Sequence, residues 1–299
     1  MKVLNIGSCN VDYIYQVDHF VQPGETMDCL SLGIGCGGKG LNQSIAIAQA
    51  GAEVCHAGLI GAEAGFLKEK LWEKGVDTSL MRLGQGANGH AIIQVDRHGS
   101  NCILLYGGTN QQLTEEYVDF VLGQFSPGDI LVLQNEVNLI PYIMERASAA
   151  GLRIAFNAAP YSEAVKRYPL DKVTWLIVNE VEGEGLSGKR DCSEIVQELR
   201  RLYPRTNLLL TLGKAGCIYV SDEEQIHQKA CRVEAVDTTA AGDTFTGYFI
   251  RGICEDLPMT RTLKLATVAS AIAVTRPGAA DSVPTFEDVF RSPLLSALN

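Results

Sequence analysis

Residues 237–245, Asp-Thr-Thr-Ala-Ala-Gly-Asp-Thr-Phe, combine the residue types that could perform catalysis. Small residues form a turn that opens a long predicted helix, and the first free N–H groups of such a helix attract anions. Asp243 lies at the same place, but it is itself an anion, so it could instead take a proton from an attacking hydroxyl. The pattern suits phosphoryl transfer, although an acidic residue that only stabilises a helix start would look the same.

A second glycine-rich segment, residues 33–42, nearly matches a phosphate-binding loop. Gly33 to Lys39 follow the Walker A spacing, but Gly40 stands where a magnesium-binding hydroxyl is required. No buried parallel strand is predicted before it, so it also lacks the context of a dinucleotide-binding fingerprint. Its glycines allow close backbone approach, and Lys39 and Asn42 supply donors. The segment predicts a platform for a polyhydroxylated ligand, with a plain turn before a helix as the alternative.

Further polar residues follow apolar runs that we expect to be strands. Asn10 and Asp12 could bind neighbouring hydroxyls or build an Asx turn. Asn179 could cap a helix or reach a nucleotide phosphate, and Glu182 could orient water around magnesium. Ligands of open α/β sheets bind at the carboxyl ends of strands, so these positions are candidates for a site. Other residues in such positions are Glu136 and the segment 211–216.

The elements that position these residues alternate along the chain. Continuous apolar runs such as Ile130-Leu131-Val132-Leu133 are typical of parallel strands covered on both faces. Strand and helix alternation at this spacing predicts a doubly wound α/β layer. We expect strands at 3–7, 54–60, 130–133, 153–156, 174–178 and 207–212. We expect helices at 39–50, 63–74, 114–123, 138–150, 180–186, 191–203, 242–255 and 259–275.

Residues 11–34 and 88–106 break this alternation with a strand-like pattern. Within the second segment, 91–95 and 102–106 flank a turn and predict a hairpin. We interpret both segments as a small β lid inserted in a single domain of residues 1–299. The lid holds many apolar residues, so it needs covering by substrate, by the body or by a second copy. This requirement predicts a homodimer formed through the lid.

Composition narrows the classes of partner. The chain has 299 residues and a net charge of −10, which argues against nucleic-acid binding. Its nine cysteines form no C-x-x-C pair, and its five histidines show no metal-ligand spacing. No signal peptide and no membrane-spanning apolar run are evident. We expect a cytoplasmic protein with reduced thiols and a small-molecule partner, and no membrane partner.

Together and in this order, these segments resemble the ribokinase (PfkB-type) family of carbohydrate kinases over essentially the whole chain. The two signatures are residues 38–42, Gly-Lys-Gly-Leu-Asn, and residues 240–243, Ala-Ala-Gly-Asp. The resemblance implies a three-layer α/β/α sandwich with a mainly parallel central sheet and a small β-sheet lid. It implies ATP-dependent phosphorylation of the primary hydroxyl of a pentose, with D-ribose converted to D-ribose 5-phosphate. Another small sugar or nucleoside acceptor, or a non-catalytic sugar-binding relative, remains open as an alternative.

The resemblance also implies a role for each matching residue. Asp243 is the base that deprotonates the sugar, and the amides of Ala240, Ala241 and Gly242 form an anion hole. With Asp243, the sugar contacts are Asn10, Asp12, Gly38, Lys39, Asn42 and Glu136. The nucleotide contacts are Asn179, Thr211, Gly213, Lys214, Gly216, Gly242 and Thr267. Glu182 orders the Mg²⁺ shell, and a monovalent cation, usually K⁺, is held by Asp237, Thr239, Ala273, Arg276, Gly278 and Ser282.

Some positions depart from the family pattern. The catalytic turn has Ala240 where glycine is commoner, and Thr267 stands where some relatives place a histidine against adenine. The nucleotide contact at Thr267 is therefore open. Residues 157–160, Asn-Ala-Ala-Pro, replace the usual Asn-Pro-Ala-Pro, which affects a loop and not the chemistry.

Overall fold

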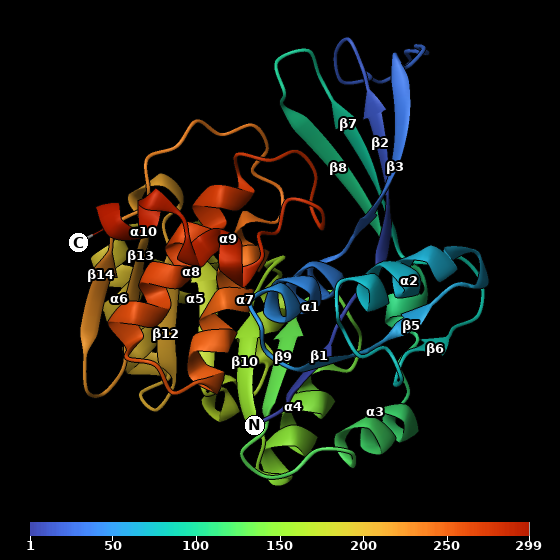
Figure 1. Cartoon of the computed structure of the whole chain (residues 1–299). Coiled ribbons are helices and arrows are strands. Elements are labelled where there is room, and N and C mark those ends of the chain that lie inside the picture. The colour runs from blue at the N-terminus through green and yellow to red at the C-terminus, as the bar shows by residue number, and fades with distance from the viewer. Residues whose placement is uncertain (299) are drawn as a thin grey trace.

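The computed structural model describes residues 1–298, and its centre is an eight-stranded sheet (Figure 1). The strand order is β14-β13-β12-β11-β10-β9-β1-β4. The strands are β1 (Val3–Ile6), β4 (Val54–Ala57), β9 (Ile130–Gln134), β10 (Arg153–Asn157), β11 (Trp175–Asn179), β12 (Asn207–Thr211), β13 (Cys217–Val220) and β14 (Gln225–Gln228). All pairings from β4 to β12 are parallel, as predicted. Strands β13 and β14 were not predicted, and they extend the sheet in antiparallel fashion.

Successive side chains of each strand enter two different cores. In β9, Ile130 and Val132 belong to one buried cluster, whereas Leu131 and Leu133 belong to the other. The first cluster includes residues of helices α1 (Lys39–Gln49), α2 (Gly65–Glu73), α7 (Ala241–Cys254) and α8 (Met259–Ala273). The second includes residues of α3 (Glu115–Leu122), α4 (Ile140–Ala149), α5 (Glu180–Ser187) and α6 (Cys192–Leu202). Strands buried on both faces explain the continuous apolar runs, and the result is the predicted three-layer sandwich.

The remaining elements are short. Helices α9 (Phe286–Phe290) and α10 (Pro293–Ala297) end the described chain. Single 3-10 turns lie at Ala62–Ala64, Gly108–Gln111, Glu163–Arg167, Leu170–Lys172 and Gly213–Ala215. The strand predicted at 54–60 is interrupted, because β5 (Leu59–Ile60) leaves the main sheet and pairs with β6 (Arg82–Leu83). No helix within residues 1–298 is long and apolar enough to cross a bilayer.

A second sheet of four strands projects from the body (Figure 1). Its order is β3-β2-β7-β8, with β2 (Asn10–Gln16), β3 (Ser31–Gly37), β7 (His90–Val95) and β8 (Asn101–Tyr106). The hairpin predicted at 91–95 and 102–106 is present as β7 and β8. The strand β2 continues directly from the loop after β1, so one end of this small sheet is anchored at the edge where the parallel strands end.

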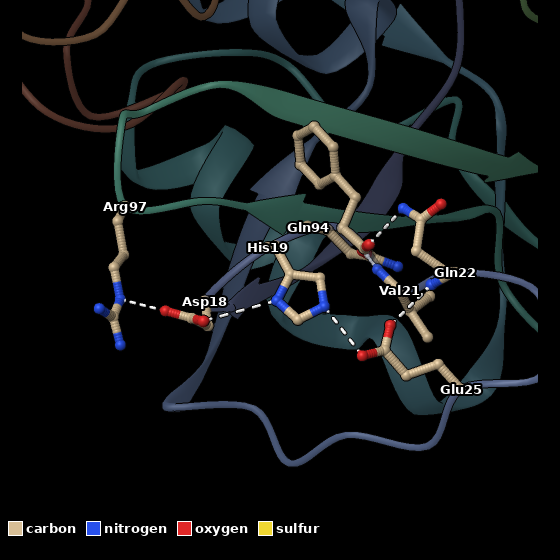
Figure 2. Close-up of polar contacts among 8 residues, drawn as sticks. Asp18, His19, Val21, Gln22, Glu25, Gln94 and Arg97 are labelled. Carbon is tan, nitrogen blue, oxygen red and sulfur yellow. Dashed lines mark hydrogen bonds and ion pairs between the residues drawn. The ribbon is translucent and has the colours of Figure 1, made fainter.

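The loop between β2 and β3 is held by a cluster of charged side chains (Figure 2). His19 contacts Glu25 through Nε2 at 2.9 Å and Asp18 through Nδ1 at 3.5 Å. Asp18 also pairs with Arg97, which lies in the turn between β7 and β8. This cluster ties the β2–β3 loop to the neighbouring hairpin at the far end of the small sheet.

Candidate active site

The predicted site residues converge where the parallel strands end and two helices begin. Asn10 follows β1, Glu136 follows β9, and Asn179 and Thr211 are the last residues of β11 and β12. Helix α1 begins at Lys39 and helix α7 at Ala241, and each faces this edge of the sheet with its N-terminus. Segments far apart in the sequence are thus brought together by the shared direction of the strands.

The start of α7 provides both a carboxylate and free backbone donors. Ala240 has the left-handed conformation, with φ 59°, which turns the chain sharply into the helix. The N–H of Ala241 bonds weakly to the carbonyl of Thr238, at 3.3 Å. The N–H groups of Gly242 and Asp243 follow in the first turn, where an α-helix offers them no carbonyl. The Asp243 carboxylate lies in the same turn and is only 6% exposed.

Asp243 is held by two amide side chains from α1. Asn42 donates from Nδ2 to Oδ2 at 3.2 Å, and Gln43 donates from Nε2 to Oδ1 at 2.9 Å. The two helices can approach this closely because Gly247 of α7 has no side chain, and a Cβ there would collide with Ala46 of α1. Sequence reasoning missed Gln43. Its one signal is that it continues the polar run begun by Asn42, directly before the apolar part of the helix at 39–50.

Lys39, Glu136 and Ser8 form a second group beside Asp243. Glu136 Oε2 accepts from Ser8 Oγ at 2.5 Å and from the Lys39 N–H at 2.9 Å. The negative charge of Asp243 raises the pKa of Lys39, and Glu136 adds to this effect. Burial raises the pKa of Glu136, against the opposing charge of Lys39. The lysine is therefore a charged donor between two carboxylates, and Ser8 is a further residue that the sequence did not reveal.

Asn10 and Asp12 lie on the first part of β2. Asn10 Oδ1 accepts from Asn110 Nδ2 at 2.7 Å, and Asn110 Oδ1 accepts from the Cys9 N–H at 3.0 Å. Asn110 was also missed, and it lies one hundred residues from Asn10 in the sequence. Burial raises the pKa of Asp12 to about 7, and the charge of Glu136 adds to the shift. Burial and the charge of Glu136 therefore both disfavour the ionised form of Asp12.

Two glycines before α1 are required by close approach. Gly38 has φ 92°, and a Cβ there would lie 2.9 Å from the Asn10 nitrogen. At Gly37 a Cβ would collide with the Asp12 carboxylate. The glycine-rich segment thus brings the backbone that leads into α1 against β2.

On the other side of the site, Asn179 and Glu182 form hydrogen bonds with each other at the start of α5. Asn179 Oδ1 accepts from the Val181 and Glu182 N–H groups, and Glu182 Oε2 accepts from the Asn179 N–H at 2.6 Å. This capping box realises the helix-cap alternative for Asn179. The box uses the Asn179 amide oxygen, and the Asn179 side chain also forms a hydrogen bond with Glu182 that favours the charged form of this carboxylate. Burial raises the pKa of Glu182.

The remaining predicted nucleotide residues differ in environment. Thr211 donates from Oγ1 to the Val178 carbonyl at 3.4 Å. Gly216 has φ 104°, and a Cβ there would collide with the Gln228 carbonyl. Backbone conformation and packing therefore both require a glycine at this position. Thr267 is buried on α8, and its Oγ1 has no hydrogen-bond partner within residues 1–298. Gly213 and Lys214 lie exposed on the 3-10 turn after β12.

The predicted cation residues lie in two connected segments. Asp237 accepts from the N–H and hydroxyl of Thr239 through Oδ1, and from the Gly278 N–H through Oδ2 at 3.0 Å. Ser282 donates from Oγ to the Ala279 carbonyl, and Arg276 turns toward Asp288. Ala273 ends α8 just before this loop. Hydrogen bonds from Thr239 and Gly278 lower the pKa of Asp237, although its partial burial acts the other way.

Oxygen atoms are the only ligands that this loop offers to a cation. Nowhere in residues 1–298 do three or more His, Cys, Asp or Glu side chains gather as a metal cluster would require. Backbone carbonyls with one carboxylate and one hydroxyl suit a hard, weakly charged ion. Asp237 and Ser282 fit that description, whereas the guanidinium of Arg276 does not face the loop.

A buried carboxylate beside free helix N–H groups, at the carboxyl edge of a mainly parallel sheet, defines an α/β small-molecule phosphotransferase. The family comparison identifies it further. Residues 1–286 match the model of the pfkB family carbohydrate kinases, and the chain belongs to this family.

Relatives of known name agree with this assignment. The chain is 34% identical over 301 residues to a ribokinase of Staphylococcus aureus, covering 96% of this chain and 98% of that one. It is 32% identical over 294 residues to a ribokinase of Haemophilus influenzae, with 95% of each chain covered. A deoxyribokinase of Salmonella typhi is 30% identical over 296 residues, with coverage of 96% and 97%.

Solved structures show the same likeness. A ribokinase from Cryptococcus neoformans in complex with ADP superposes with a TM-score of 0.86 at 32% identity, covering 97% of this chain and 98% of that one. Arabidopsis thaliana ribokinase complexed with ribose and ATP gives a TM-score of 0.85 at 25% identity, with 98% of each chain covered. The main sheet and the small additional sheet are thus those of ribokinase structures.

Proposed function

We propose that this protein transfers the γ-phosphoryl group of ATP to the primary hydroxyl of D-ribose, giving D-ribose 5-phosphate. The buried Asp243 carboxylate beside the free N–H groups of α7 is the observation that supports this most directly. The names of the two ribokinase relatives and of the ribose and ATP complex support the choice of substrates.

In this proposal, Asp243 accepts the proton of the sugar hydroxyl as its oxygen attacks the phosphoryl group in line. The amides of Ala240, Ala241 and Gly242 stabilise the negative charge that develops on the phosphoryl oxygens. Ala241 is the weakest contributor of the three in this structure, because its N–H already bonds to Thr238. A bound phosphoryl group would compete with the Thr238 carbonyl for this N–H.

The sugar lies between α1 and β2, where it meets donors and acceptors at several hydroxyls. Lys39 and the Nδ2 groups of asparagine donate, while carboxylates accept. Asn42 Oδ1 is buried without a hydrogen-bond partner within residues 1–298, and an acceptor of this kind suits a sugar hydroxyl. The sugar contacts that we assign are Asn10, Asp12, Gly38, Lys39, Asn42 and Glu136.

ATP lies along the ends of β11 and β12. We assign it to Asn179, Thr211, Gly213, Lys214, Gly216, Gly242 and Thr267. When bound, Mg²⁺ neutralises phosphate charge, and Glu182 holds part of its water shell. Glu182 Oε2 is used in the capping box, so this role falls to its other oxygen.

A monovalent cation, K⁺ in the first instance, completes the proposal. We assign it to the oxygen atoms of Asp237, Thr239, Ala273, Gly278 and Ser282, with Arg276 contributing through its carbonyl. The support is the Asp237 contact with Gly278, which joins the anion-hole turn to the cation loop. An ion there would stabilise the turn that presents the amides of residues 240–242.

The small sheet is proposed as a lid over the sugar and as the contact of a homodimer. It carries exposed apolar side chains on β8 and β3, including Leu104 and Ile34, which a second copy would cover. Closure over the sugar would exclude water, which otherwise competes as phosphoryl acceptor. We place the reaction in the cytoplasm, where ATP is available.

The first experiment is a measurement of ADP release with ATP, Mg²⁺ and a panel of sugars and nucleosides, in K⁺ and then in Na⁺. Ribose should give the highest kcat/KM, with faster turnover in K⁺. The panel includes 2-deoxyribose, because a deoxyribokinase is among the relatives. Preference for that sugar, or for a nucleoside, would replace ribose as the acceptor and leave the chemistry unchanged.

Asp243→Asn tests the assignment of the base. The amide keeps the shape of the side chain but cannot take the proton, so turnover should fall by roughly 10²–10⁴-fold. Sugar affinity, measured by calorimetry, should change much less. Near-normal turnover in this variant would contradict the role of Asp243.

A further inference from the structure

A chain of buried amide side chains ends on the Asp243 carboxylate. Gln43 donates from Nε2 to Asp243 Oδ1 at 2.9 Å, and Gln134 donates from Nε2 to Gln43 Oε1 at 2.8 Å. Gln134 Nε2 also donates to Asn5 Oδ1 at 3.0 Å. Gln43, Gln134 and Asn5 are 0%, 1% and 0% exposed, so bulk water does not compete for these bonds. We call these three side chains the amide network.

The carboxylate fixes the orientation of every member of the amide network. An ionised carboxylate only accepts, so Gln43 must turn its NH₂ group toward Asp243 and its oxygen toward Gln134. Gln134 then uses one hydrogen for Gln43 and the other for Asn5. Asn5 donates in turn to the Gly40 carbonyl and to Ser44 Oγ, both at 2.8 Å. Because the bonds are linked, turning one amide over breaks at least two of them.

This arrangement leaves a buried oxygen without a partner. Gln134 Oε1 forms no hydrogen bond within the described residues, and an unpaired buried acceptor destabilises the folded state. An apolar side chain at residue 134 would avoid that cost. The glutamine is explained by its NH₂ group, which supplies both donors that Gln43 and Asn5 need. Stability alone therefore does not account for Gln134.

The two carboxylate oxygens of Asp243 are held unequally, which suits a group that accepts a proton through one of them. Gln43 holds Oδ1 at 2.9 Å, whereas Asn42 approaches Oδ2 at 3.2 Å. Asn42 is also one of the residues that we assign to the sugar. One oxygen is thus bound from inside the protein, and the other lies on the side of the sugar contacts. A carboxylate held by one oxygen presents the second in a fixed direction.

We propose that Gln43 is a positioning residue that fixes the Asp243 carboxylate for proton transfer, and that Gln134 fixes Gln43. This inference rests on the proposed function, in which Asp243 is the base. Gln43 does not touch the reacting atoms. It acts by holding Oδ1 so that the other oxygen meets the sugar hydroxyl in the same direction at each turnover.

The test begins with Gln43→Met, which keeps the length of the side chain but removes the donor. We expect kcat with ribose to fall by about 10–100-fold, because a misplaced catalytic group loses rate steeply. The sugar KM should stay within about threefold, because Gln43 makes no sugar contact in the proposal. An unchanged kcat would overturn the proposal, and so would a rise in the sugar KM as large as the fall in kcat.

Gln134→Met provides a second measurement one bond further from Asp243, and it also serves if Gln43→Met does not fold. It should also lower kcat and leave the sugar KM nearly unchanged, but the fall in kcat should be smaller than in Gln43→Met. The double variant should be little slower than Gln43→Met alone, because both substitutions interrupt one connection. Effects that simply multiply would mean that the two glutamines act independently, which would overturn the linkage between them.

Ile47→Val is the matched control for loosened packing of α1. Ile47 is fully buried in the same helix and belongs to the apolar core. This variant should unfold at a slightly lower urea concentration, with no change in kcat. If it slowed turnover as much as Gln43→Met, the effect of Gln43 would be general loosening and the proposal would fail.

Failure of this inference can be told apart from failure of the proposed function. If Asp243→Asn is inactive while Gln43→Met turns over normally, the function stands and the positioning role is wrong. If the unmodified protein has no turnover with any acceptor of the panel, the proposed function itself fails, and the positioning role fails with it.

Discussion

The Asp12 carboxylate lowers the stability of the fold, although we expect it to favour sugar binding. Its carboxylate is half-buried against Gly37, and this burial together with the nearby Glu136 raises its pKa to about 7. The unfolded chain releases this proton near pH 4, so between these values the folded state holds more protons. Stability from this group therefore falls as pH rises from about 4 to about 7. A carboxylate that lowers stability in this way is expected at a ligand-binding site.

Asp12→Asn removes the buried charge and keeps the shape. At pH 8 the free energy of unfolding should rise by about 1–2 kcal/mol, measured by urea unfolding, because a desolvated carboxylate is gone. Sugar KM should rise at the same time.

The pH dependence of binding gives a second readout at Asp12. In the unmodified protein, sugar KM should rise as pH falls from 8 to 6, because the protonated carboxyl is a poorer acceptor for hydroxyls. In Asp12→Asn, KM should not change over this range. A stability loss in the variant at pH 8 would contradict the buried-charge explanation.

At the level of elements, the contact between α1 and α7 depends on a glycine. Gly247 lies against Ala46 and Ile47, and a Cβ would require the helices to separate. The same crossing brings Asn42 and Gln43 to Asp243. The helix pair is therefore both a packing unit and the frame of the proposed base.

Gly247→Ala should lower the free energy of unfolding by about 1–3 kcal/mol through overpacking, despite alanine's better helix propensity. Turnover should fall as well, because the separation lengthens the contacts of Asp243. Gly65→Ala in α2 is the control, since a Cβ there meets no atom within 4 Å and should be neutral or stabilising. Equal effects of both substitutions would mean that the close crossing is not the cause.

The β2–β3 loop should respond to pH through His19. Its hydrogen bond to Glu25, with a further contribution from Asp18, raises the pKa of His19 above its ordinary value of 6.5. The contribution of the charged imidazolium is then fully present below pH 6.5 and is lost as pH rises through the raised value. Arg97 also faces this cluster, through its ion pair with Asp18.

Hydrogen exchange in residues 18–30, corrected for the intrinsic rate, should therefore show better protection at pH 6 than at pH 9. His19→Gln should remove most of this difference. If the unmodified loop shows the same protection at both values, the ion pairs of Figure 2 do not hold it in solution.

At the scale of the whole molecule, exposed large apolar side chains gather on strands β3 and β8 of the projecting sheet. All six residues of β8 are exposed, and Leu104 is 68% exposed. In the proposed homodimer, a second copy covers this surface. The mass in solution should then be about twice the 32.3 kDa of one chain.

Leu104→Glu should be monomeric when its mass is measured by light scattering, because the substitution would bury a charge at the dimer contact. The matched control is Phe290→Glu, which adds the same charge at an exposed aromatic on α9. It should leave the dimer intact. A monomeric mass for the unmodified protein would contradict the homodimer, and loss of the dimer in both variants would mean that charge alone causes it.

The sequence by itself determined the parallel layer and the candidate residues at its edge. Continuous apolar runs specify strands buried on both faces, and glycine-rich turns mark the starts of α1 and α7, because periodicity and turn chemistry are local properties. Apart from the strand predicted at 54–60, which is interrupted after β4, the strand boundaries differ from the predicted ones by one residue. The hairpin β13–β14 was missed, since an edge extension has no distinctive pattern.

Only the tertiary structure decided which side chains meet. Gln43 and Asp243 are 200 residues apart, and their contact depends on the closeness of two helices at Gly247. The pairing of Asn110 with Asn10 has the same origin. Side-chain hydrogen bonds need their atoms placed to within a few tenths of an ångström, and that precision comes from packing across elements, which no local pattern encodes.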